Sequence, residues 1–140
     1  MTRVVAAAWA VPVAAPPIRD GAVAWSDDGA ITAVGPAAEV LAAHPDATVE
    51  RYPTGIVLPG LVNAHCHLEY AVYGGFGDGL PFGAWLRDHI RRKRRLTPEH
   101  VRASADLGVA LALASGVTTI ADCAYDGCVV DAARDAGLRG

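Results

Sequence analysis

Apolar and polar residues alternate in short segments over the first 57 residues of the chain, with turn residues between them. Period-two alternation is typical of strands that bury one face. Within 22–35, Asp28-Gly29 is a strong signal for a two-residue β-hairpin. The pattern predicts strands over 4–13 and 48–53, two more within 22–35, and a short helix over 36–44. We therefore expect a small, mostly antiparallel β unit whose last strand stops at Pro53.

From Ile56 onward, longer apolar runs alternate with segments of helical periodicity. The run 56–67, IVLPGLVNAHCH, is typical of parallel strands buried on both faces. Thr97-Pro98-Glu99 marks a helix start, with Thr as the cap and Pro at the first helical position, and Gly116 ends that helix. The predicted elements are strands over 56–67 and 117–123, with helices near 85–90, over 97–115 and over 129–140. This order predicts the opening of an α/β domain with parallel strands.

Composition narrows the class of protein without naming an activity. The hydrophobic fraction of 52% and the charged fraction of 19% indicate a globular chain. A net charge of -3 gives no whole-chain attraction to nucleic acid or to anionic membranes, so we expect neither partner. The three cysteines form no disulfide framework, which favours a reduced, cytoplasmic setting. Pro12 interrupts the apolar N-terminal stretch and favours a first strand over a secretion signal.

The candidate chemistry lies at the end of the run 56–67, where His65 and His67 are one residue apart. Residues two apart on a strand share a face, so both imidazoles are expected to point the same way. Two imidazoles separated by ~6.5–7 Å along a strand can reach one ion. Two polar residues that cap a strand are the alternative interpretation of the spacing. Position favours a metal site, because α/β barrels place their chemistry at the carboxyl ends of parallel strands.

Three segments together resemble the N-terminal part of the amidohydrolase superfamily: LPGLVNAHCHLEY, GFGDGLPFGAWLRDHI and GVTTIAD. The branch that they resemble comprises the metal-dependent deaminases and chlorohydrolases of purine, pyrimidine and triazine rings. The resemblance implies an α/β fold, the first part of a (β/α)8 metal-dependent hydrolase barrel preceded by a small β-sandwich-like region. Residues 1–57 would be half of a composite β-sandwich, and residues 58–140 the first βα units of a truncated barrel.

The same resemblance implies an activity and a cofactor. His65 and His67 would be the first ligands of one divalent metal ion, with Zn²⁺ favoured over Fe²⁺. The ion would activate water for attack on a carbon–nitrogen (non-peptide) bond, releasing a ring amino group from a small heterocyclic substrate. The other ligands and the proton-transfer groups would come from later strands. We therefore expect no catalytic residue here beyond the two histidines, and expect this chain alone to be inactive.

The neighbouring residues bear on the substrate and leave alternatives open. Asn63 favours the deaminase branch over the hydantoinase and dihydroorotase branch, where Asp is usual at this position. A cyclic-amide hydrolase is the alternative enzyme. A non-catalytic, truncated remnant is the alternative from another class of protein. Arg94 replaces a Glu that holds the ribose in methylthioadenosine deaminases, while HCHLEYA is similar to the aminodeoxyfutalosine deaminases. Glu69 is predicted to contact substrate, with a loop salt bridge or helix cap as the alternative. The oligomeric state, monomer or homo-oligomer, stays open.

Several other polar residues are predicted to be structural. Cys66 should point away from the histidines and pack as a buried thiol, and Cys123 and Cys128 should be structural too. His89 falls on the apolar face of its helix, which predicts a core position. The basic run 91–95 is expected to be a solvated helix face.

Overall fold

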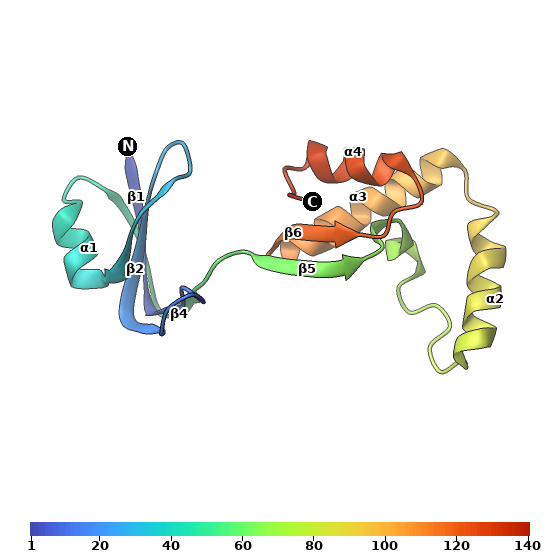
Figure 1. Cartoon of the computed structure of the whole chain (residues 1–140), viewed down its shortest axis with the longest axis horizontal. Helices are drawn as coiled ribbons and strands as arrows, with labels where there is room; N and C mark the ends of the chain where they lie inside the picture. The colour runs from blue at the N-terminus through green and yellow to red at the C-terminus, as the bar shows by residue number, and fades with distance from the viewer. The chain divides into compact units, whose positions relative to one another are not determined.

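The computed structural model describes residues 1–140 and divides into two compact units, Met1–Pro59 and Gly60–Gly140 (Figure 1). The first unit is a four-stranded sheet in the order β3-β2-β1-β4 with one helix. Its antiparallel pairs are β1–β2 and β2–β3, whereas β4 runs parallel to β1. Its elements are β1 (Thr2–Ala10), β2 (Ile18–Ser26), β3 (Ile31–Pro36), α1 (Ala37–Ala43) and β4 (Thr48–Val57).

Local sequence signals are confirmed through most of this unit. The hairpin turns at Asp28-Gly29, where Gly29 has a φ of 83° that suits glycine. The helix α1 begins after Pro36 and lays Val40 on the sheet. Small residues line the contact between the sheet and the helix, and the buried cluster consists of Val4, Ala6, Ala22, Ala24 and Val40.

The predicted end of the fourth strand at Pro53 is wrong, because β4 continues to Val57. The strand lies at the edge of the sheet, and its register with β1 shifts between Ala7 and Trp9, opposite the segment that contains Pro53. A proline lacks the N–H donor of a sheet ladder, and an edge strand with a bulge tolerates that loss. Ile56 and Val57 therefore belong to β4, so the predicted strand 56–67 is in fact divided at Leu58–Gly60.

The second unit contains a parallel strand pair, β5 and β6, connected through helices. The helix α3 begins as predicted, since Thr97 Oγ1 accepts from the amide of His100 and the His100 ring accepts from the amide of Thr97. Gly116 follows α3 with a φ of 81°. The elements are β5 (Leu61–Cys66), the 3₁₀-helix η1 (Leu68–Tyr73), α2 (Phe82–Lys93), α3 (Pro98–Ala114), β6 (Val117–Asp122) and α4 (Gly127–Asp135).

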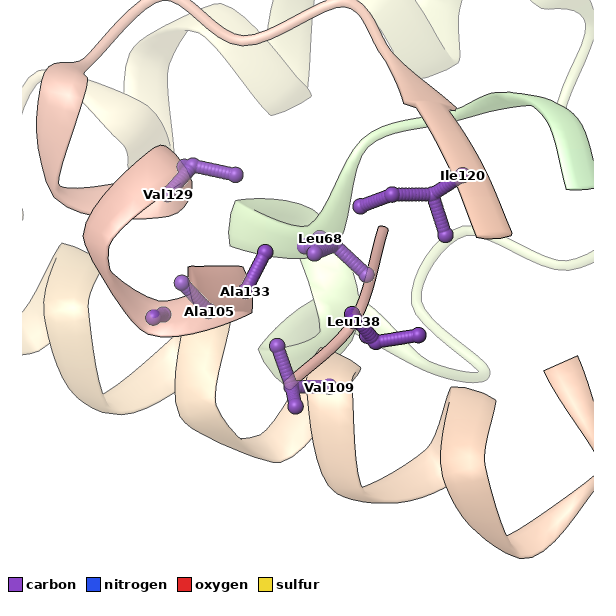
Figure 2. Packing of buried hydrophobic residues seen from close by; sticks show 8 residues of the cluster. Leu68, Ala105, Val109, Ile120, Val129, Ala133 and Leu138 are labelled. Carbon is purple, nitrogen blue, oxygen red and sulfur yellow. The ribbon is translucent and has the colours of Figure 1, made fainter. Parts of the chain in front are cut away.

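The core of this unit gathers around Leu68, which lies among side chains from α3, β6 and α4 in Figure 2. The buried cluster is Leu68, Ala105, Val109, Ile120, Val129, Ala132, Ala133 and Leu138. Cys66 packs against it from β5. Much of β5 outside this contact is open, with Leu61 48% and Val62 67% exposed. Burial on both faces was expected for this strand and is not seen, since β5 pairs with β6 alone and the core covers its Cys66 side.

None of the helices has both the length and the apolar character needed to span a lipid bilayer. The order strand, helices, strand, helix confirms the α/β arrangement predicted from Ile56 onward.

Candidate metal centre

The carboxyl ends of β5 and β6 bring His65, His67 and Cys123 together. His65 is the penultimate residue of β5, His67 follows that strand directly, and Cys123 follows β6. The backbone amide of Cys123 donates to the carbonyl of Cys66 over 3.0 Å, which fixes the two strand ends side by side. The imidazoles of His65 and His67 have centroids 5.2 Å apart and are nearly perpendicular, at 86°. One potential ligand atom from each of the three residues lies within 4.8 Å of the others.

This donor set fits a divalent ion of borderline character. Imidazole nitrogen and cysteine sulfur are the ligand types that zinc prefers in proteins. The buried Nδ1 atom of His67 has no hydrogen-bond partner, although buried ring nitrogens normally have one. A bound cation would give this nitrogen the partner that it lacks. His65 and His67 could therefore hold the ion.

A row of aromatic rings orients His67. Its imidazole stacks on Tyr70 with centroids 4.8 Å apart and planes 13° from parallel. The Tyr70 ring in turn meets His89 edge-on at 4.3 Å, and Trp85 stacks on His89 at 5.1 Å. The row thus runs from the end of β5 through η1 to α2, and it restricts rotation of the His67 ring.

Glu69 is buried, with only 2% of its surface exposed, and faces Lys93 of α2. The Oε1–Nζ distance is 3.9 Å, and neither carboxylate oxygen has a hydrogen-bond partner. A salt bridge was the alternative to the substrate contact predicted for Glu69 from the sequence. The substrate contact itself stays a prediction. Lys93 also donates to the Tyr70 hydroxyl over 3.1 Å and lies 3.8 Å from the centroid of the Tyr125 ring. The basic run 91–95 is thus exposed except at Lys93, which turns inward.

Asp122 supports the site through hydrogen bonds, and the sequence analysis did not identify it. Its Oδ2 atom accepts hydrogen bonds from the Leu68 amide at 2.8 Å and from the Cys66 thiol at 3.3 Å. Burial, together with the adjacent Asp122 carboxylate, raises the pKa of Cys66 to about 12. Cys66 is therefore a packed, protonated thiol, as predicted. The sequence signal that could have identified Asp122 was its position at the end of the second parallel strand.

Cys123 lies beside a histidine, which the sequence analysis did not anticipate, and its predicted structural role stays a prediction. Its Sγ atom lies 3.5 Å from Nδ1 of His65, and its side chain is exposed. The overlooked signal was position, because the carboxyl ends of adjacent parallel strands meet at one edge of a sheet. Cys128 packs against the core as expected. His89 is buried as expected, but both of its ring nitrogens lack partners, and burial lowers its pKa, assisted by the charge of Lys93.

These features define an α/β protein with a candidate metal centre at the carboxyl ends of parallel strands. A family model described as "Amidohydrolase family" matches residues 56–139, and the chain belongs to this family. A second model, "Imidazolonepropionase-like composite domain, bacteria", matches residues 27–47.

The relatives lie in the deaminase and chlorohydrolase branch, as the sequence resemblance indicated. The 5-methylthioadenosine/S-adenosylhomocysteine deaminase of Nitratidesulfovibrio vulgaris (Miyazaki F) is 42% identical over 106 residues, which are 75% of this chain and 24% of the relative. A zinc-bound adenosine deaminase from Xanthomonas campestris superposes with a TM-score of 0.73 and 30% identity, over 97% of this chain and 32% of that one. For the zinc-complexed atrazine chlorohydrolase of Arthrobacter aurescens, the TM-score is 0.78 at 22% identity, over 97% and 34% of the two chains.

The chain spans between 20% and 26% of the length of the first three curated relatives. The solved structures cover nearly all of it while it covers about a third of them, which confirms the expected fold class as the first part of a (β/α)8 hydrolase barrel.

Proposed function

We propose that this chain carries the first metal ligands of a zinc-dependent hydrolase that removes an amino group from a heterocyclic ring. The observation that supports the proposal most directly is the convergence of His65 and His67 at the carboxyl end of β5, with their ring centroids 5.2 Å apart. The family match over 56–139 and the deaminase relatives favour deamination over other hydrolyses. A single Zn²⁺ is proposed on the basis of the imidazole donors and the zinc-bound neighbours.

Each residue has a defined part in this proposal. His65 and His67 bind through neutral ring nitrogens, and the Tyr70 stack keeps the His67 ring in the binding orientation. The bond from the Leu68 amide to Asp122 holds the backbone that follows His67. The bound ion supplies Lewis acidity, which lowers the pKa of a water molecule from its bulk value toward ~7. Glu69 is proposed to contact the substrate, with Lys93 as the cation that faces its carboxylate.

The remaining ligands and the groups that move protons are proposed to lie outside these 140 residues, so this chain alone should not turn over substrate. A cytoplasmic location is proposed from its three unpaired cysteines.

The test of the site is a Zn²⁺ titration of the purified chain, with His65→Ala and His67→Ala as variants. His44→Ala is the matched control, because His44 bonds the Val40 carbonyl in the other unit. One ion should bind the parent and the control, and neither site variant should bind comparably. Equal binding by all four proteins would contradict the proposal. Turnover is tested separately, as ammonia release from aminopurines, aminopyrimidines and aminotriazines by the product of the complete gene from which the chain comes.

A further inference from the structure

The hydroxyl group of Ser104, a buried residue of α3 that is 3% exposed, bonds to two backbone groups of η1. Its Oγ atom accepts from the Val72 amide over 3.0 Å and donates to the Glu69 carbonyl over 2.8 Å. In a 3₁₀-helix the amide of residue i+3 bonds to the carbonyl of residue i, so these two groups are each other's regular partners. A hydroxyl that bonds to both sets their separation from outside the helix, as an inserted side chain does in other helices.

The helix that carries this hydroxyl is held closely against η1. Gly108 lies one turn further along α3, on the same face as Ser104. A Cβ atom at Gly108 would lie 2.6 Å from the Leu68 carbonyl oxygen, so the backbones of α3 and η1 are in contact there. Leu68 is itself buried in the core of the unit. Ser104 therefore acts on η1 from a fixed scaffold.

Tyr70 lies between the two bonded groups in the chain, and its position determines the stack on His67. The Tyr70 amide donates to the His67 carbonyl over 3.0 Å, the first i to i+3 bond of the turn. Side chains three residues apart eclipse each other in a 3₁₀-helix. This geometry explains why the two rings have centroids 4.8 Å apart and planes 13° from parallel. An α-helical turn of 3.6 residues would offset the rings around the helix axis.

The orientation of the His67 ring depends on this stack. A metal-binding histidine usually donates its second ring N–H to a carboxylate, a carbonyl or water, and that bond fixes the ring. The contacts of the His67 ring are instead aromatic, with Tyr70 face to face and His65 edge-on. Its buried Nδ1 atom has no hydrogen-bond partner. The Tyr70 stack thus takes the place of an orienting hydrogen bond.

We propose that Ser104 is a positioning residue of the metal site, whose hydroxyl fixes the 3₁₀ geometry that stacks Tyr70 on His67. The proposal rests on the proposed function, because it takes His67 as a ligand. Without the hydroxyl, the Val72 amide and the Glu69 carbonyl must bond to each other directly or lose a partner. The backbone at Tyr70 changes in either case. The His67 ring then loses its fixed orientation, and metal affinity falls.

The first experiment is nuclear magnetic resonance of the metal-free chain at one fixed pH. The Tyr70 ring current shifts the ring protons of His67 because the two rings are stacked. Ser104→Ala should move these resonances toward their positions in Tyr70→Leu, and Ser104→Cys, which keeps a weaker donor of similar size, should move them less. Ser115→Ala is the matched control, since Ser115 ends the same helix and bonds the Ala112 carbonyl at the surface. It should leave the resonances in place.

The second experiment measures Zn²⁺ affinity in a double-mutant cycle, after circular dichroism has confirmed that each protein is folded. Ser104→Ala should weaken binding by about tenfold, the lower end for residues that orient a ligand. In the Tyr70→Leu background the same substitution should weaken it by less than about twofold, because the stack is already absent. Ser115→Ala should bind as the parent does. A purely structural serine would lower stability equally in both backgrounds and leave the affinity unchanged.

The outcomes separate this inference from the proposed function. His67 resonances and a Zn²⁺ affinity that are unchanged in Ser104→Ala overturn the role of Ser104, even if the variant is less stable. Equal losses of affinity with and without Tyr70 overturn it as well. If the parent binds no Zn²⁺, the proposed function fails, while the resonances of the metal-free chain still test whether Ser104 orients the ring. If Ser104→Ala does not fold, Ser104→Cys decides by the same two measurements.

Discussion

The backbone amide of Leu68 donates a hydrogen bond of 2.8 Å to the carboxylate of Asp122, 54 residues further along the chain. The bond joins the end of β6 to the residue that follows His67. The same carboxylate oxygen accepts from the Cys66 thiol, so a single side chain holds both ends of the turn from β5 into η1. The placement of the histidine pair thus depends on a residue of the neighbouring strand.

Replacing Asp122 with Ala should lower the free energy of unfolding by about 1.5–3 kcal/mol, because the buried Leu68 amide loses a charged acceptor. Urea denaturation followed by circular dichroism measures the change. Asp78→Ala is the control, since Asp78 is exposed in the glycine-rich loop, and it should stay within about 0.5 kcal/mol of the parent. A loss no larger than that of the control would show that the bond does not stabilise the turn.

Lys93→Met should destabilise the chain by about 3 kcal/mol, because it leaves the buried Glu69 carboxylate without a countercharge. We take the lower end of the range for broken buried pairs, since the Lys93 side chain is 30% exposed. The double variant Glu69→Leu/Lys93→Met should recover most of the loss, which makes the pair measurable as a thermodynamic cycle.

Arg91→Met provides the comparison for Lys93, because Arg91 is the neighbouring cation of the same helix and pairs with Asp88 at the surface. Its stability should change by less than about 1 kcal/mol. Equal losses for the two single variants would mean that Glu69 does not depend on Lys93.

Gly108→Ala should destabilise the chain by about 1–3 kcal/mol, although alanine is the better helix former. A Cβ atom at this position would lie 2.6 Å from the Leu68 carbonyl oxygen and 2.9 Å from its Cα atom, so α3 would have to move away from η1. Gly127→Ala at the start of α4 is the matched control, since no atom lies within 4 Å of its added Cβ. Thermal unfolding of the two variants compares them, and a Gly108→Ala midpoint at or above that of the control would refute the close packing of α3 on η1.

The chain should lose stability as the pH falls below about 6.5, through His89. Burial first, then the charges of Lys93 and His67, hold the pKa of His89 below its ordinary value. The unfolded chain therefore takes up a proton that the folded chain resists, so the stabilisation is complete above the unfolded pKa and declines below it. In the presence of a chelator, urea denaturation of His89→Leu at about pH 7.5 and about pH 5.5 should show a smaller difference than the parent. His44→Gln should keep the parent's difference, and an unchanged difference in His89→Leu would exclude this origin.

The sequence by itself determined the features that depend on local rules. Asp28-Gly29 specifies a tight turn because glycine adopts a positive φ without strain, and Thr97-Pro98 starts α3 because the cap satisfies a free amide. The spacing of His65 and His67, with one residue between them, brings both rings to the same face of the strand, since alternate strand residues share a face. The order of strands and helices after Ile56 likewise followed from hydrophobic periodicity.

Only the tertiary structure decided which distant residues meet. Cys123 lies beside His65 across 58 residues, and Lys93 turns out of an otherwise exposed basic run to reach Glu69. The passage of β4 through Pro53 depends on its place at the sheet edge and on a register shift against β1. Local periodicity shows which face of an element is apolar, but it does not determine the register between strands or how closely helices pack. Those are set by the packing of segments far apart in the chain, and they brought Cys123 and Asp122 to the end of the strand that carries the two histidines.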